Sequence, residues 1–253
     1  MHIKIEDFFQ PSSIHLFNVK DEEYKILAPY IESVDAFAKT TYQSIYVIDY
    51  NRRNFLYVSN NPLFLCGYTP EEVKALGYSF YLQQVPEKDL QFLLDVNMAG
   101  FNFYERIPQE EKLSYTISYD FYLKQPNNKT ILINHKLKPF LLNDNQIWLA
   151  MCIVSLSSRT TTGNAEIRKS NTSDIYKYDL EFKKWKLAEK IALGEKEKQI
   201  LCLSAQGYTM NEIADKIFLS MDTIKFYRKN LLAKLDVKNI TEAITYATNH
   251  NIL

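Results

Sequence analysis

The sequence predicts an α+β protein in which an N-terminal antiparallel sheet of five strands, with accompanying helices, precedes a C-terminal all-α bundle of four helices. Two changes along the chain support this division. All eight prolines lie at or before Pro139, so the N-terminal part of the chain is rich in turn signals and the C-terminal part has no proline. Apolar and polar residues alternate from Leu113 to Lys124, as in a strand with one buried face, whereas the residues after Gly194 have helical spacing.

The composition is typical of a globular chain of one or two domains, with 253 residues, 30 Lys and Arg, and 30 Asp and Glu. Charges and Pro11 interrupt the N-terminal residues, which resemble neither a signal peptide nor a membrane span. We therefore expect a cytoplasmic protein without membrane contact. Cys66, Cys152 and Cys202 lack CxxC spacing and lie among apolar neighbours, so three buried reduced thiols are expected rather than a disulfide or a metal site.

The first expected element is an amphipathic helix from Pro29 to Lys39, within an N-terminal extension of residues 1–39. Proline suits the first turn of a helix, and the apolar stripe consists of Ile31, Val34, Phe37 and Ala38. This stripe either packs on its own domain or forms a dimer seam.

Two short strands and several short helices are expected next. The strands are Ser44–Asp49 and Asn54–Ser59, on either side of a turn at residues 50–53. Residues Thr69–Glu72 combine an N-cap threonine, a proline at the first helical position and a glutamate that completes a capping box. A further helix is predicted for Leu90–Met98.

Three longer strands follow, at Leu113–Lys124, Thr130–Phe140 and Ile147–Leu156. The turns between them are marked by Asn, Asp and Pro at residues 125–128 and 143–145. With the two earlier strands they make the five strands of an antiparallel sheet, and the helices between the two groups are expected to cover one face of it.

This order of elements, together with the segments YVSNNPLFLCGYTPEEV and VPEKD, resembles a PAS sensor domain over residues 40–157. The resemblance implies a pocket between the helices and the inner sheet face that holds haem, flavin, a small metabolite or nothing. Residues Tyr78–Gln84 lie where a flavin-adduct motif would be expected and contain no cysteine, and the helix before Gly100 has no histidine for haem. The cofactor, if there is one, stays unknown.

His135 is the one histidine in the predicted sheet, and it shares a strand face with Ile131, Ile133 and Leu137. We favour the interpretation that it is a core or edge histidine with satisfied hydrogen bonds, because a lone histidine lacks the partners that a metal or haem site needs. The surrounding aromatic residues either line a pocket for a flat ligand or simply fill the core. They are Tyr115, Tyr119, Phe121 and Trp148.

Residues 158–193 are interpreted as a linker between domains. Ser, Thr, Asn and Gly are frequent from Ser157 to Asn171, as in an exposed connection. Alternation returns from Ile175 to Leu187 and includes Trp185, so a small hairpin is expected to dock on a neighbouring domain.

The C-terminal domain, residues 194–253, is expected to begin with three helices, because residues that favour helix starts and helix ends separate the apolar segments. Glu195 and Glu197 suit the positive end of the first helix dipole, and Gly207 permits a left-handed end. Thr209 is a suitable N-cap for the second helix and Ser220 for the third. Three short helices with such joints predict a helix-turn-helix.

The third helix carries a local excess of positive charge, with Lys225, Arg228, Lys229 and Lys234 against Asp222. Phosphate attraction acts within about 8–10 Å in physiological salt, so this local excess matters more than the neutral total. A solvated basic face is the alternative on charge alone.

The same segment resembles the LuxR/GerE-type DNA-binding domain nearly throughout. The matching residues are Glu197, Ile200, Leu201, Gly207, Asn211, Glu212, Ile213, Ala214, Ser220, Thr223, Ile224, Lys225, Arg228, Asn230, Leu232, Lys234, Leu235, Val237, Asn239, Thr241, Glu242 and Ala243. Gly194, Tyr227 and Asp236 depart from the family, which usually has a Ser or Thr cap, a His and a Gly there.

The resemblance implies that the third helix lies in the major groove and that a fourth helix helps to pair two domains. Carried over to this chain, the residues facing base edges are Lys225, Phe226 and Lys229, and the candidates for phosphate contact are Thr209, Asn211, Thr223 and Arg228. The pairing face of the fourth helix would consist of Ala243, Ile244 and Ala247.

These observations predict a one-component transcription regulator and not an enzyme. The chain has no Gly-rich phosphate loop, HExxH or GxSxG motif, and its four histidines are scattered. The expected partner is double-stranded DNA, bound as a homodimer with half-sites about 10 bp apart. A small-molecule ligand of the PAS-like domain and RNA polymerase are further candidate partners. Two alternatives remain: a PAS-type receptor whose helical tail serves association, and a sigma-factor-like polymerase subunit.

Overall fold

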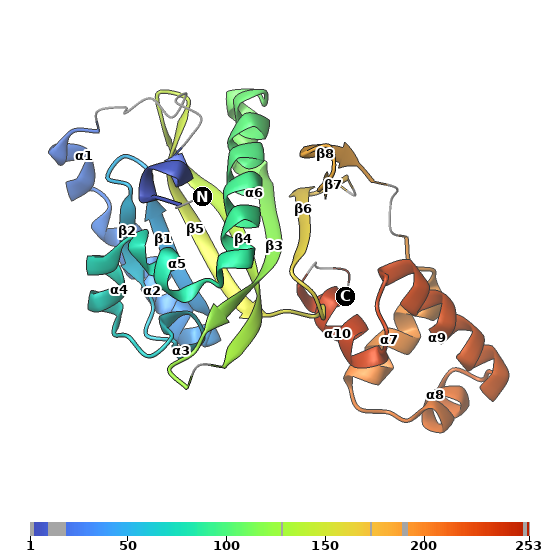
Figure 1. Cartoon of the computed structure of the whole chain (residues 1–253). Helices are drawn as coiled ribbons and strands as arrows, with labels where there is room; N and C mark the ends of the chain where they lie inside the picture. Colours follow the sequence, from blue (N-terminus) through green and yellow to red (C-terminus); the bar gives the residue numbers. More distant parts are fainter. Residues whose placement is uncertain are drawn as a thin grey trace. The chain divides into compact units, whose positions relative to one another are not determined.

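The computed structural model of the chain describes residues 3–9, 19–127, 129–172, 174–188, 192–249 and 252. The chain divides into two compact units (Figure 1). The N-terminal unit contains residues 1–156 and 161–188, and the C-terminal unit contains residues 157–160 and 189–253. Among the described helices, none has the length and apolar character needed to cross a membrane.

The N-terminal unit contains a long helix, α6, and several shorter ones. The helices are η1 (Ile5–Phe9), α1 (Asp21–Lys25), α2 (Ala28–Thr41), α3 (Pro62–Leu65), α4 (Pro70–Leu76), α5 (Ser79–Gln84), α6 (Glu87–Glu105) and η2 (Gln109–Ser114). The capping box expected at the start of α4 is confirmed, because the Thr69 hydroxyl accepts the Glu72 N–H and the Glu72 carboxylate accepts the Thr69 N–H.

In the described residues the sheet has eight antiparallel strands, so the prediction of five strands was wrong. The strands are β1 (Ser44–Asp49), β2 (Asn54–Val58), β3 (Tyr115–Lys124), β4 (Thr130–Asn143), β5 (Gln146–Leu156), β6 (Gly163–Lys169), β7 (Ile175–Asp179) and β8 (Lys184–Leu187). Their order is β2-β1-β5-β4-β3-β6-β7-β8. Strands β1 to β5 are the five strands predicted for the sheet, in the predicted chain order of two strands, helices and three long strands.

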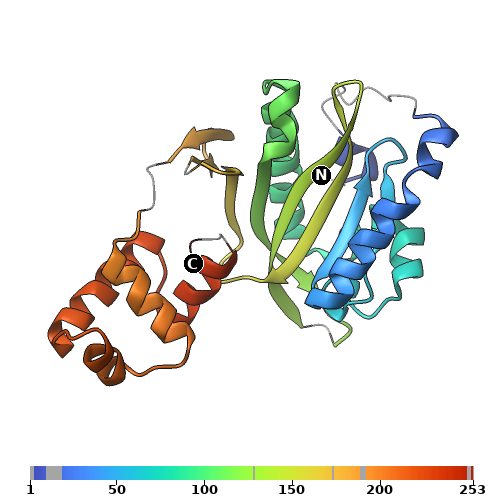
Figure 2. The same ribbon diagram turned by 180° about the vertical axis from the view of Figure 1, so that it is seen from behind.

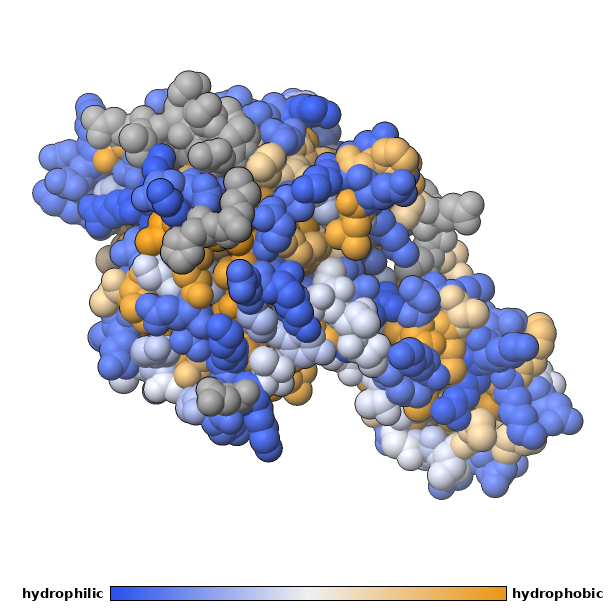
Figure 3. Space-filling view, in the orientation of Figure 1, coloured by the Kyte–Doolittle hydropathy of each residue, from blue (hydrophilic) through white to orange (hydrophobic). Residues whose placement is uncertain are grey.

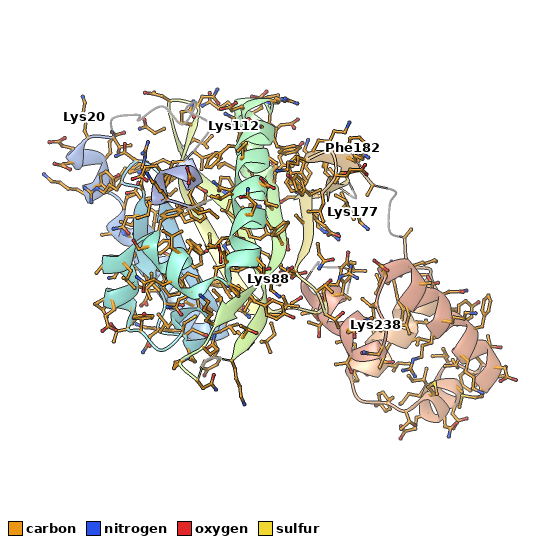
Figure 4. All side chains as sticks on the ribbon, viewed as in Figure 1. Lys20, Lys88, Lys112, Lys177, Phe182 and Lys238 are labelled. Carbon is orange, nitrogen blue, oxygen red and sulfur yellow. The ribbon has the colours of Figure 1, made fainter. Side chains whose placement is uncertain are left out.

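The three further strands arise in the segment interpreted as a linker. Strand β6 pairs with the edge of β3, with Thr116 opposite Arg168 and Ile117 opposite Ile167. Ala165 and Ile167 of β6 are buried, which a solvated connection would not allow. The small hairpin expected over Ile175–Leu187 forms as β7 and β8, with Phe182 at its exposed turn (Figure 4).

Helices cover both faces of the sheet. On one face, α3 to α6 enclose the main core, whose largest buried members include Tyr46, Phe64 and Phe121 (Figure 1). On the other face, α2 lies across β1 and β5, where its Ile31 and Val34 pack against a cluster with Trp148 (Figure 2). The apolar stripe of α2 thus packs largely within its own unit. Its role as a dimer seam stays a prediction.

The cysteines differ in exposure from the sequence prediction. Cys66 and Cys152 are buried, but Cys202 is exposed on α7. The apolar neighbours Leu201 and Ile200 face inward, and a helix turns the next position outward. The prediction of three buried thiols was therefore wrong for Cys202.

The described residues of the C-terminal unit form four helices, as predicted. They are α7 (Glu195–Ala205), α8 (Met210–Lys216), α9 (Met221–Leu235) and α10 (Ile240–Asn249). Gly207 takes φ +90° between α7 and α8, and Asp236 takes the left-handed conformation at the end of α9. The family usually has glycine at this position, but Asp236 takes the same left-handed conformation and still ends α9.

The apolar face of α10 belongs to the core of the same unit. Ala243 and Ala247 are fully buried and cluster with Leu201, Leu231 and Leu235 of α7 and α9. The prediction that Ala243 and Ala247 belong to a face that pairs two domains was wrong, because these small residues pack against α7 and α9 and close the core of their own unit.

A candidate nucleic-acid interface on helices α8 and α9

The turn between α8 and α9 is fixed by backbone hydrogen bonds and by a small core. Ser220 caps α9 by accepting the Thr223 N–H, and the Leu219 N–H donates to the Ala214 carbonyl at 3.0 Å. Ile213, Ala214 and Ile224 are buried together beneath the turn. These contacts hold α9 at a fixed inclination to α8, as a helix-turn-helix requires.

The outer face of α9 presents the three residues predicted to reach bases. Lys225, Phe226 and Lys229 are all exposed, and their spacing places them on one side of the helix. Lys225 makes only a surface ion pair with Asp222 at 3.4 Å, which contributes little. In the part of the chain that the structure describes, Lys229 has no ion pair or hydrogen bond. Both ammonium groups are therefore available to a ligand.

The residues predicted to contact phosphate lie on both helices. Thr209 and Asn211 are exposed at the start of α8, while Thr223 and Arg228 are half-buried on α9. Both of the hydroxyl groups among these four residues are already engaged. The Thr209 hydroxyl donates to Glu212 at 2.7 Å and the Thr223 hydroxyl shares a hydrogen bond with Ser220 at 2.7 Å.

The capping box at the start of α8 also lowers the pKa of the Glu212 carboxylate. The Thr209 N–H and then the Thr209 hydroxyl hydrogen-bond the Glu212 carboxylate, and these bonds lower its pKa below the usual value of 4.5. Glu212 is thus ionised at neutral pH and is held at the cap.

Lys234 does not belong to this outer face. Its ammonium lies 2.7 Å from the buried Glu197 carboxylate, which also accepts the Gly194 N–H at 2.7 Å. Of the four cations on α9 counted in the sequence, Lys225, Arg228 and Lys229 therefore remain for an outside partner. Sequence reasoning missed this ion pair because its members lie 37 positions apart.

Two exposed aromatic side chains accompany the basic residues. Phe226 is 59% exposed and packs edge-to-face on Tyr227, while Phe218, in the turn before α9, is 93% exposed. Sequence reasoning overlooked Phe218, although a phenylalanine beside a turn signal was visible. Hydrophilic residues cover much of the visible face of this unit, with apolar surface between them (Figure 3).

This part of the chain matches a known family. Residues 192–247 match the family described as "Bacterial regulatory proteins, luxR family", also called GerE. The C-terminal unit therefore carries a LuxR-type helix-turn-helix domain, as the sequence resemblance predicted.

The relatives that match this chain include response regulators. The response regulator protein VraR of Staphylococcus aureus is 41% identical over 61 residues, which cover 24% of this chain and 29% of that protein. VraR of Staphylococcus saprophyticus is 27% identical over 139 residues, 51% of this chain and 64% of that protein. The chain thus spans less than two thirds of the length of either relative.

Two solved structures resemble larger parts of the chain weakly. The VqmA dimer of Vibrio cholerae has a TM-score of 0.36 at 14% identity, covering 86% of each chain. The PAS domain of a protein from Colwellia psychrerythraea has a TM-score of 0.37 at 14% identity and covers 52% of this chain and 96% of that domain. Scores this low do not establish a shared fold.

Proposed function

We propose that this chain is a one-component, DNA-binding transcription regulator. The observation that carries the proposal is the outer face of α9, where Lys225, Phe226 and Lys229 are exposed on one side of the helix within a LuxR-type domain. Helix α9 has 15 residues and is about 22 Å long, and the major groove admits an α-helix. In this proposal α9 lies in the major groove of operator DNA.

The roles of individual residues follow from their chemistry. Lys225 and Lys229 donate to guanine O6 and N7, and Phe226 contacts a thymine methyl group. Arg228, Thr209, Asn211 and Thr223 contact phosphates and fix the register of the helix on the duplex.

The N-terminal unit is proposed to be the sensor. Its element order matches the PAS-like arrangement inferred from the sequence, and its interior contains small cavities beside polar groups. A signal there would control a dimer that reads two half-sites about 10 bp apart. Because the alanines of α10 are buried, the dimer contact has to use other surface. The division into residues 1–39, 40–157, 158–193 and 194–253 belongs to the same proposal, with strands β6 to β8 of the third segment joined to the sheet of the N-terminal unit. Any contact with RNA polymerase belongs to it as well.

The residue roles are tested by substitution in the full-length protein. After operator selection, Lys225→Ala and Lys229→Ala should each weaken specific binding about 5- to 150-fold and relax base preference. Arg228→Ala should weaken binding to all sequences similarly and reduce the salt slope by about one. Lys198→Ala, which removes one exposed charge from α7, is the matched control and should leave binding unchanged.

The same measurement separates the alternatives. Binding that is unaffected by all three substitutions on α9 would exclude the proposed groove contact. A folded full-length protein that binds no duplex at low salt would favour the receptor whose helical tail serves association.

A further inference from the structure

Two small cavities lie in the N-terminal unit between α6 and the inner face of the sheet. Each has a volume of about 20 Å³, room for about one water molecule. Asn97, Tyr119 and Leu137 line both cavities, so the two cavities are adjacent.

One cavity is bordered by a chain of buried hydrogen bonds. The Tyr46 hydroxyl contacts the Tyr81 hydroxyl and, at 2.5 Å, Nε2 of His135. All three side chains are buried, and His135 is only 1% exposed. The other ring nitrogen of His135, Nδ1, is buried and has no hydrogen-bond partner in the described structure. The prediction of a histidine with satisfied hydrogen bonds was therefore wrong for Nδ1.

An unpartnered buried nitrogen is unfavourable, because it has lost its water without gaining another partner. Burial also lowers the pKa of His135 to about 3, so the ring is neutral at physiological pH. A neutral imidazole has one donor and one acceptor nitrogen. Since the Tyr81–Tyr46–His135 chain can run in either direction, Nδ1 can either donate a hydrogen bond or accept one.

The lining of both cavities excludes a charged guest. Among the described residues, this lining consists of apolar side chains, tyrosines, Asn97 and His135, and contains no Asp, Glu, Lys or Arg. An ion transferred from water into such a lining would lose its hydration without an opposite charge to compensate. A neutral molecule with one polar group would instead satisfy Nδ1 and place its remaining atoms against apolar walls.

The second cavity offers the apolar part of such a site. Its walls include Val96, Phe101 and Ile147, and it lies where α6 approaches the sheet closely. A Cβ on Gly100 would come within 2.8 Å of the Ile117 Cδ1, so glycine permits this close approach. Helix α6 therefore forms the side of the second cavity that faces the sheet.

We propose that this interior binds a small, uncharged, largely apolar molecule whose single hydroxyl, amide or carbonyl group hydrogen-bonds Nδ1 of His135. The polar group occupies the cavity beside His135 and the apolar body occupies the second cavity. Because each cavity holds about one water molecule, Tyr119 and Leu137 move aside when the ligand enters. This inference rests on the sensor part of the proposed function and specifies the class of signal.

Three probes of matched shape test the ligand class on the full-length protein. Phenol and toluene differ by a hydroxyl in place of a methyl group, and benzoate adds a negative charge. Calorimetry should show phenol binding about tenfold more tightly than toluene, because only phenol satisfies Nδ1. Benzoate should not bind.

A second readout observes the histidine directly. In protein labelled with ¹⁵N at histidine, phenol should shift the Nδ1 resonance of His135, which the His135→Phe variant assigns by its absence. That variant should also bind phenol and toluene equally. If His135→Phe does not fold, His135→Leu, which also removes Nδ1, serves in its place and should likewise bind the two probes equally.

The outcomes distinguish this inference from the proposed function. Equal affinity for phenol and toluene, or a Nδ1 resonance that phenol leaves unchanged, would overturn the inference. So would a long-lived water on Nδ1 that persists in saturating phenol. DNA binding is measured separately, so an intact response to the α9 substitutions would then leave the DNA-binding proposal standing.

Discussion

Glu197 is a single side chain that joins the start of α7 to the end of α9. Its carboxylate is buried and receives hydrogen bonds from the Gly194 N–H and from the Lys234 ammonium. The LuxR/GerE-type pattern includes both Glu197 and Lys234, but it does not indicate that the two side chains form an ion pair. The structure therefore gives Lys234 a structural role that its position on a basic helix concealed.

The first prediction concerns that ion pair. Lys234→Met leaves the Glu197 carboxylate buried with one partner fewer, and should reduce the stability of the C-terminal unit by about 1–3 kcal/mol. Amide hydrogen exchange of α7 and α9 in the full-length protein measures the loss. Lys198→Met, which breaks an exposed pair with Glu195, is the matched control and should change exchange little. Equal effects of the two substitutions would contradict the assigned role.

His135 gives a prediction about pH. Its pKa is lowered to about 3 by burial, whereas an unfolded histidine titrates near 6.5. Between these values the unfolded chain binds a proton that the folded chain does not, so stability falls as the pH falls, by about 1 kcal/mol per pH unit. His135→Phe should lack this dependence.

Urea unfolding at pH 7 and pH 5 measures the difference. Both tryptophans, Trp148 and Trp185, lie in the N-terminal unit, so their fluorescence follows that unit alone. Parallel pH dependence in the wild type and in His135→Phe would show that the histidine is not buried in a neutral state.

Among the elements, those with local signals were predicted well. The boundaries of β1 and the starts of α4, α8 and α9 follow from alternation and from caps that neighbouring residues supply. Strand β6 was missed because its pairing partner, β3, lies far away in sequence and its flanks are rich in Ser and Thr. The inward direction of the α10 alanines likewise depends on packing against two other helices, α7 and α9.

Because β6 pairs with β3, its buried side chains should stabilise the N-terminal unit. Ile167 is fully buried opposite Ile117, so Ile167→Ala should destabilise the N-terminal unit by about 2–4 kcal/mol. Leu180→Ala in the β7–β8 turn, where the side chain is 66% exposed, is the control and should have little effect. Tryptophan-monitored urea unfolding compares the two. If Ile167→Ala proved as mild as the control, residues 163–169 would be a linker after all.

The candidate interface could be predicted from the sequence further than the sensor interior. Lys225, Phe226 and Lys229 are recognisable because a helix pattern alone places them outside. The His135 cavity could not be predicted in this way, because it depends on Tyr46 and Tyr81 reaching the same point from β1 and α5. Those contacts exist only once the sheet and the helices have assembled.

At the scale of the whole molecule, we propose that the C-terminal unit reads DNA and that the N-terminal unit senses a signal. The two assignments rest on different observations, namely the exposed face of α9 and the polar group at the cavity. Each can therefore fail without the other. DNA binding is the central claim, since a sensor without it would regulate nothing through α9.

The most direct test is fluorescence anisotropy of the full-length protein on a pool of genomic and random duplexes over a salt series. The account predicts tight binding to a selected subset, affinity that falls steeply with salt, and loss of that selection in the double variant Lys225→Ala, Lys229→Ala. No binding at low salt, or selection that survives the double substitution, would contradict the claim that α9 reads operator DNA.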